Sequence, residues 1–140
     1  MAPRRWILEL GSKLELSYKV QSNDLAKALS SDPQDDFPEV YATSRMIALM
    51  ELVSARLMKP LLSEGELSVG VNVNVTHMAA TPNDVEVKAV AIYTGIEDKL
   101  HKFDVILYDP KGEAGRGTHT RAIVKTERLV QGAMNRVNPT

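Results

Sequence analysis

One glutamate lies on the apolar side of the most hydrophobic helix that the sequence predicts, and one histidine lies on the apolar face of the following strand. In a helix over residues 43–59, Glu51 has no basic residue three or four positions away. Its neighbours on the helical wheel are Ile47, Ala48, Ala55 and Met58. The next strand alternates valines at 69, 71, 73 and 75, and a period of two places His77 on their face. A buried carboxylate must be neutralised, hydrogen-bonded or used, so the pair indicates an active site if the two faces pack together.

The hydrophobic pattern predicts the elements that position these side chains. Thr43 or Ser44 is the expected N-cap of the helix, and Pro60 ends it near Lys59. The pattern also predicts strands over residues 13–20, 67–79, 85–96, 100–108 and 115–125, with a short helix over 23–29. The sequence Asp-Pro-Lys-Gly at 109–112 joins the last two strands as a hairpin turn.

The order of strand, helix and four antiparallel strands predicts an α+β protein. The helix is apolar over much of its circumference, which indicates that a sheet covers it. A long central helix wrapped by a curved antiparallel sheet of five or more strands is the hotdog fold. We expect residues 1–140 to form a single domain of this kind, with flexible ends over 1–9 and 128–140. The second of these ends is expected to be helical at most briefly.

The composition narrows the classes of function. A net charge of −1 without a basic run argues against a nucleic-acid or anionic membrane surface. No apolar stretch approaches the ~18 residues of a membrane span, and the apolar run at the start is too short for a signal peptide. The absence of cysteine excludes disulfides, thiolate catalysis and Cys-ligated zinc, and it is compatible with a reducing compartment, so we expect a cytoplasmic protein. The three histidines lack metal-ligand spacing, and we expect no metal.

Four short segments resemble blocks of a known family, the fluoroacetyl-CoA thioesterase-like hotdog proteins. The segments, in the same order in both, are Phe-Pro-Glu-Val-Tyr-Ala-Thr at 37–43, Leu-Met-Glu at 49–51, Val-Thr-His at 75–77 and Gly-Thr-His-Thr-Arg at 117–121. The resemblance covers roughly residues 10–127. It implies hydrolysis of an acyl-CoA thioester, with coenzyme A as part of the substrate and no further cofactor. It also implies that Thr43, Glu51 and His77 are catalytic.

Thr43 has two interpretations. A threonine at a helix start is most often a cap, whereas the resemblance maps Thr43 onto a catalytic hydroxyl. If Thr43 and Glu51 are both helical, they lie ~12 Å apart along the axis. Either Thr43 lies on a loop that folds back, or the three groups converge around a substrate. The roles stay open as well: His77 is a general base or acid, and Glu51 orients it or attacks the carbonyl.

Three further residues are expected to bind substrate. Gly70 interrupts a strand, which indicates either a bulge or a close approach of ligand, and its family counterpart lines the thioester site. Arg121 is expected in a central strand, where an arginine needs a carboxylate or phosphate partner. The resemblance implies that it orients the catalytic residues. Alternatively, it is a structural partner of Glu51. Phe37 corresponds to a flap residue over the acyl pocket. Gln34 stands where the family has a second phenylalanine, so the resemblance does not extend to specificity for a fluorinated acetyl group.

The sequence thus predicts an acyl-CoA thioesterase that acts on a small or medium acyl group as a homodimer or a tetramer, and that binds neither nucleic acid nor membrane. Backbone N–H groups at the helix start are expected to hold the carbonyl oxygen. The alternatives are a hotdog enoyl-CoA hydratase and a non-catalytic acyl-thioester binding protein. His101 and His119 are predicted to be surface or edge residues.

Overall fold

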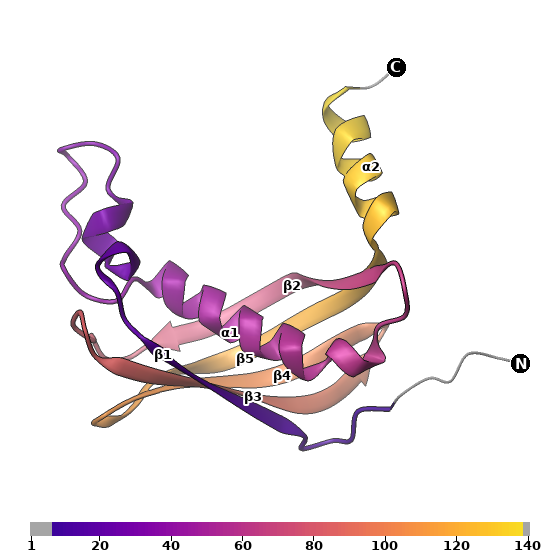
Figure 1. Cartoon of the computed structure of the whole chain (residues 1–140), viewed down its shortest axis with the longest axis horizontal. Coiled ribbons are helices and arrows are strands. Elements are labelled where there is room, and N and C mark those ends of the chain that lie inside the picture. The colour runs from indigo at the N-terminus through magenta and orange to yellow at the C-terminus, as the bar shows by residue number, and fades with distance from the viewer. Residues whose placement is uncertain (1–6, 139–140) are drawn as a thin grey trace, which may run out of the picture.

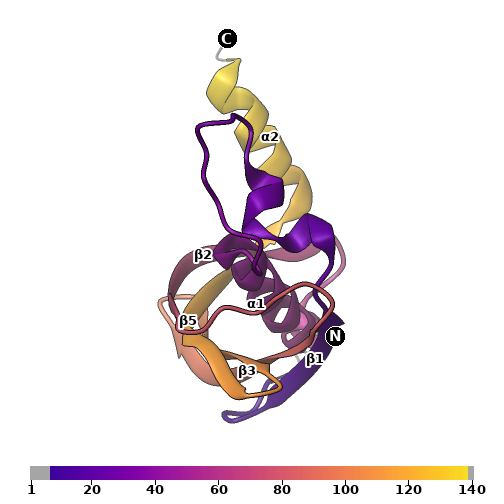
Figure 2. The ribbon, with the colours of Figure 1, turned by 90° about the vertical axis from the view of Figure 1, so that its left-hand side faces the viewer.

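A five-stranded antiparallel sheet curves around one long helix in the computed structural model, which describes residues 7–138 (Figures 1 and 2). The strands are β1 (Lys13–Lys19), β2 (Glu66–His77), β3 (Glu86–Glu97), β4 (Leu100–Asp109) and β5 (Gly112–Lys125). The helices are α1 (Thr43–Leu57) and α2 (Thr126–Val137), with short 3-10 helices η1 (Ser22–Asp24), η2 (Ala26–Leu29) and η3 (Lys59–Leu61). The strand order is β1-β3-β4-β5-β2, and each neighbouring pair is antiparallel. This arrangement confirms the predicted hotdog fold.

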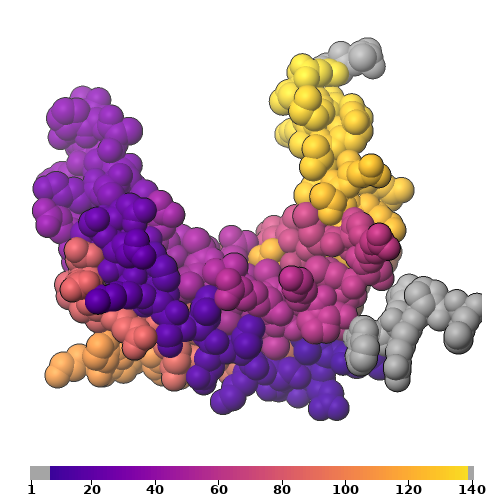
Figure 3. Space-filling view, in the orientation of Figure 1, coloured from indigo at the N-terminus to yellow at the C-terminus, as the bar shows by residue number. Residues whose placement is uncertain are grey.

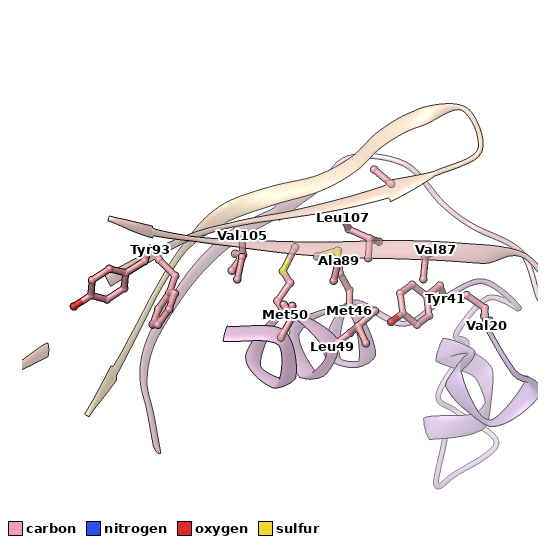
Figure 4. Packing of buried hydrophobic residues seen from close by; sticks show 14 of the residues in the cluster. Val20, Tyr41, Met46, Leu49, Met50, Val87, Ala89, Tyr93, Val105 and Leu107 are labelled. Carbon is pink, nitrogen blue, oxygen red and sulfur yellow. The ribbon is translucent and has the colours of Figure 1, made fainter. Parts of the chain in front are cut away.

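The core lies between α1 and the middle strands of the sheet. Met46, Met50 and Val53 share one face of α1 and are fully buried. Figure 4 shows Met46 and Met50 directed at the sheet, where Ala89 of β3 and Val105 of β4 face them. The small Ala89 side chain leaves room for the long methionines, so α1 packs closely on the sheet.

The first turn of α1 differs from the prediction in a way that matters for the site. The N-cap is Ala42, which makes no side-chain cap hydrogen bond, so neither Thr43 nor Ser44 is the cap. The backbone before the helix is fixed by η1 instead, because Ala42 N donates to Asp24 O at 2.9 Å. The helix ends at Leu57 rather than at 59, and the following residues form η3. The Thr43 hydroxyl is therefore available for another partner.

A bulge in β2 overturns one predicted face. The pairing of β2 with β5 shifts register between Gly70 and Asn72, and Val71 is the extra residue. Before the bulge, Gly70 faces α1 and Val69 lies on the outer face. Beyond the bulge the odd-numbered residues face α1, among them His77. The prediction that all four valines share the face of His77 was wrong for Val69, because one extra residue inverts the alternation.

The chain after β5 forms the twelve-residue helix α2, so the prediction of at most a brief helix was wrong. Apolar residues recur there with the helical period, at 129, 130, 133, 134 and 137, although the tail is polar on average. Figures 1 and 3 show α2 and the segment over 22–42 rising on the same side of the molecule as α1, with a hollow between them. Residues 1–6 and 139–140, also predicted to be flexible, lie outside the described part. Within residues 7–138, no helix combines the length and apolarity needed to cross a membrane.

Candidate active site

Thr43 and His77 are joined by a hydrogen bond at one end of α1. Thr43 begins α1 and His77 ends β2, and Thr43 Oγ1 lies 2.8 Å from His77 Nδ1. Burial lowers the pKa of His77, and a hydrogen bond with the Ala79 backbone opposes that shift. A neutral His77 that carries its proton on Nε2 accepts the Thr43 proton at Nδ1. The pair can therefore move a proton between a hydroxyl and an imidazole.

A pocket of about 300 Å³ opens beside this pair. Its walls come from η2, the segment before α1, the first turn of α1 and the chain just after β2. Tyr41, Thr43 and His77 are its polar residues, and the other lining residues are apolar: Ala26, Pro38, Val40, Met78, Ala79 and Ala80. An apolar pocket of this size with few polar groups suits a small organic group that reacts at one end.

Glu51 lies about two turns further along α1 and is held by Arg121 of β5. Arg121 Nη1 donates to Glu51 Oε1 at 3.2 Å; the arginine side chain is 8% exposed and that of Glu51 40%. Burial lowers the pKa of Arg121 while the Glu51 charge raises it, and a guanidinium stays protonated under both influences. The structure thus supplies the basic partner that α1 itself lacks. Glu51 Oε2 has no hydrogen bond to the described residues.

Gly70 makes room for the Glu51 carboxylate. A Cβ on Gly70 would overlap Glu51 Oε1 and would lie 3.3 Å from His119 Cε1. The predicted bulge is confirmed. The Gly70 backbone is also approached closely, by the Glu51 side chain. Any side chain at position 70 would move the acid.

The structure groups the predicted residues into two sets. One set is Thr43 with His77, and the other is Glu51 with Gly70 and Arg121. Thr43 and Glu51 are both in α1, so the helical rise separates them by ~12 Å along the axis. The alternative in which Thr43 lies on a loop that folds back is wrong. Glu51 and His77 face the same side of the sheet, but each has a different partner.

The predicted flap residue lies in the loop before α1. Phe37 is 49% exposed and Gln34 is also exposed. The neighbouring Pro38 and Val40 line the pocket, so this loop borders the Thr43–His77 pair, whose hydrogen bond is exposed. Neither Phe37 nor Gln34 lines the pocket itself.

Two histidines that were predicted to be surface or edge residues are buried. His119 is 2% exposed and lies beside Arg121 and Glu51, and His101 is 9% exposed with Nδ1 2.9 Å from Tyr93 Oη. Both predictions were wrong, because β4 and β5 are inner strands and these positions face α1. The period of two that places Arg121 inside also places His119 inside, and that signal was available in the sequence. Among residues 7–138, no group of three His, Asp or Glu side chains could hold a metal ion.

A long helix wrapped by this sheet is the architecture of the hotdog class, and here it carries an acid on the helix and a histidine at the end of an edge strand. The chain matches the fluoroacetyl-CoA-specific thioesterase family over residues 20–127. It belongs to this family of thioester hydrolases.

Individual relatives agree with this assignment. The fluoroacetyl-CoA thioesterase of Streptantibioticus cattleyicolor is 41% identical over 94 residues, which are 67% of this chain and 68% of that enzyme. A solved structure of a fluoroacetyl-CoA thioesterase is similar with a TM-score of 0.86 and 32% identity over 91% of this chain and 96% of that one. A thioesterase superfamily member from Thermus thermophilus shares the fold, with a TM-score of 0.82, 23% identity and coverage of 94% of both chains.

Proposed function

We propose that this protein hydrolyses a small or medium acyl-CoA thioester to the free acid and coenzyme A. The observation that carries the proposal is the 2.8 Å hydrogen bond between Thr43 Oγ1 and His77 Nδ1 at an apolar pocket of about 300 Å³. The family relationship supports the same substrate class, since a variant of the related fluoroacetyl-CoA thioesterase has been solved with fluoroacetate and CoA.

The proposal includes a homodimer that forms through β2. This strand is an edge of the sheet, and its residues 70–74 are exposed. Pairing with a second copy removes one unpaired edge from each subunit. If the two-fold axis passes between residues 73 and 74, Gly70 of one subunit lies opposite the partner's His77. Glu51, which packs on Gly70, would then face the partner subunit's Thr43 and His77 across the interface.

This dimer offers a way to join two sets of residues that are ~12 Å apart along α1 in one chain. Each acyl site would take its acid from one subunit and its hydroxyl and imidazole from the other. Light scattering at micromolar concentration tests the assembly: a dimer of twice 15.5 kDa is expected. A species of 15.5 kDa would contradict both the dimer and the shared site.

The chemistry that we propose begins with the carbonyl oxygen at the start of α1. First-turn N–H groups of a helix lack intrahelical acceptors, and they stabilise the negative charge that develops on the oxygen. Glu51 either attacks the carbonyl carbon through Oε2 or directs a water molecule to it. Neutral His77 takes a proton from the attacking water, which is either the water that Glu51 directs to the thioester or the water that later cleaves the anhydride formed by Glu51. Collapse of the tetrahedral intermediate breaks the C–S bond, and the coenzyme A thiolate takes this proton from His77. Thr43 holds the imidazole in position or relays the proton.

Single-turnover hydrolysis in ¹⁸O-water tests for attack by Glu51, because label enters Glu51 only through an anhydride. If Glu51 attacks the carbonyl, water then cleaves an anhydride. When that water attacks the Glu51 side, the first product carries an unlabelled protein oxygen and the label enters Glu51. If Glu51 directs water, or if water attacks the acyl side of the anhydride, the product is labelled in the first turnover and Glu51 stays unlabelled.

A panel of acyl-CoA substrates tests the proposed reaction as a whole. A thioesterase releases free thiol from acyl-CoA, which a thiol reagent detects. An enoyl-CoA hydratase changes the absorbance of enoyl-CoA at about 240–280 nm without thiol release, and a non-catalytic binding protein does neither.

The net charge of −1 and the absence of cysteine fit a cytoplasmic enzyme without a nucleic-acid or membrane partner, and we include that location in the proposal.

A further inference from the structure

His119 sits between the β2 bulge and the arginine that holds Glu51. Its Nδ1 lies 2.8 Å from Asn72 O, and its Nε2 lies 3.2 Å from Arg121 Nη1. A carbonyl only accepts hydrogen bonds, so Nδ1 carries the proton, and Nε2 presents a lone pair to the guanidinium. Both partners therefore select the same tautomer. The ring is 2% exposed, which leaves it no alternative partner in water.

A charged His119 does not fit this site. Its Nε2 is 4.0 Å from Glu51 Oε1, which would allow an ion pair. A proton on Nε2 would nevertheless oppose an N–H of the permanently charged Arg121, placing donor against donor and cation against cation. Burial and Arg121 both lower the pKa of His119, and they outweigh the Asn72 carbonyl and Glu51, which raise it. Arg121 is thus the cation that faces Glu51 from β5.

The contacts of Arg121 show what His119 contributes. Nε donates to Ser68 Oγ and Nη2 donates to Ser68 O, each at 2.9 Å, so β2 fixes one side of the guanidinium. Nη1 is shared between Glu51 Oε1 and His119 Nε2, both at 3.2 Å. The histidine thus fixes the other side and limits Glu51 to one hydrogen bond through one oxygen.

We propose that His119 is a positioning residue, which orients Arg121 and thereby the free oxygen of Glu51 for reaction. The inference rests on the proposed thioesterase function and adds a residue that contacts no substrate. It also links the acid to the β2 edge, because the Asn72 carbonyl that orients His119 belongs to the bulge.

Two substitutions separate positioning from packing. His119→Gln can place an amide oxygen near Nε2 and keep an acceptor for Arg121, whereas His119→Asn can keep a donor for Asn72 O but loses that acceptor. We expect His119→Asn to lower kcat about 10- to 100-fold with little change in KM, since a misplaced reacting group costs rate rather than affinity. His119→Gln should recover most of the rate. His101→Asn is the matched control, because that buried histidine bonds Tyr93 and not Arg121.

The inference is overturned if His119→Asn keeps kcat within about twofold of the wild type, or if the Gln and Asn variants lose rate equally. Nitrogen NMR supplies a measurement that does not depend on turnover. The wild-type ring should show the neutral tautomer protonated on Nδ1, and slow exchange of the Arg121 Nη1 protons should persist in the Gln variant and disappear in the Asn variant. Absence of CoA release by the wild type would refute the proposed function alone, and the NMR result would still decide the role of His119. Exchange that is unchanged in the Asn variant, or a ring protonated on both nitrogens at neutral pH, would refute the inference.

Discussion

Substitution of Glu51 by glutamine removes a charge while it preserves the shape of the side chain. The contact at risk is a single hydrogen bond of 3.2 Å from Arg121 Nη1, and the amide oxygen of glutamine can still accept it. Arg121 keeps both of its bonds to Ser68. The substitution therefore removes only the charge contribution of the Arg121–Glu51 pair to the free energy of unfolding, and the Glu51 side chain is 40% exposed. We expect a destabilisation of about 0.5–1.5 kcal/mol, at the low end for a charged hydrogen bond because solvent screens the pair.

Activity should respond far more strongly than stability. For a chain of 140 residues, such a change corresponds to a fall in Tm of about 2–6 °C, which leaves the protein folded at 25 °C. The amide is neither a nucleophile nor a base, so kcat should fall by a factor on the order of 10² or more. Thiol release with an accepted acyl-CoA measures kcat, and thermal unfolding of the same preparation measures Tm.

Glu97→Gln serves as the control for this experiment. Glu97 also accepts from a basic side chain, Lys102 Nζ at 3.4 Å, but it lies at the exposed end of β3, away from the site. It should change neither kcat nor Tm appreciably. A Glu51→Gln variant with turnover near that of the wild type would refute the catalytic role of Glu51. A large loss of Tm together with unchanged activity per folded molecule would show that Glu51 only neutralises Arg121.

Three further substitutions or measurements test the rest of the site. His77→Ala should lower kcat by a factor of about 10²–10⁴. In the wild type, kcat/KM should rise with pH as His77 loses its proton, and the variant should lack this rise. Because burial lowers the pKa of His77, the rise should lie at lower pH than for an ordinary histidine. Gly70→Ala should displace Glu51 and lower kcat at least tenfold, which is the order of loss expected when a reacting group is misplaced. Gly132→Ala in α2 is the control and should keep full activity, because nothing lies within 4 Å of the new Cβ. With Gln34 in the flap beside Phe37, kcat/KM should favour fluoroacetyl-CoA over acetyl-CoA only weakly; a preference above about a thousandfold would exceed the 1–3 kcal/mol that pocket packing supplies.

The fold was predictable because it depends on periodicity. The spacing of Met46, Met50 and Val53 already marks the buried face of α1, and the alternation in β1 and the hairpin turn at 109–112 place the strands correctly. The amphipathic period of α2 was present as well, although the polar composition of the tail concealed it.

The partners of the polar groups were less predictable, because they depend on distant elements. Thr43 looks like a cap in the sequence, but the backbone of η1 fixes the helix start, and its hydroxyl bonds a histidine 34 residues away. Glu51 was correctly selected as an acid without a partner on its own helix. The pairing of Arg121 from β5 with Glu51 was one of two interpretations, and the structure shows this pair. The catalytic role of Glu51 stays a prediction, which the pair does not oppose because Oε2 has no hydrogen bond to the described residues.

The bulge in β2 is the feature on which the proposed chemistry depends most, and simple numbering explains why. Gly70 and His77 are seven positions apart, so in a regular strand of period two they would face opposite sides of the sheet. Gly70 must face α1 to admit Glu51, and His77 must face α1 to reach Thr43. Both conditions can hold only if an odd number of residues is inserted between them, which is what Val71 provides. The same insertion turns the Asn72 carbonyl to His119, so one irregularity of the backbone orients the acid set and the hydroxyl–imidazole set together. Deletion of Val71 should therefore abolish thioester cleavage even where the remaining sheet still pairs, because it would turn either Gly70 or His77 away from the helix.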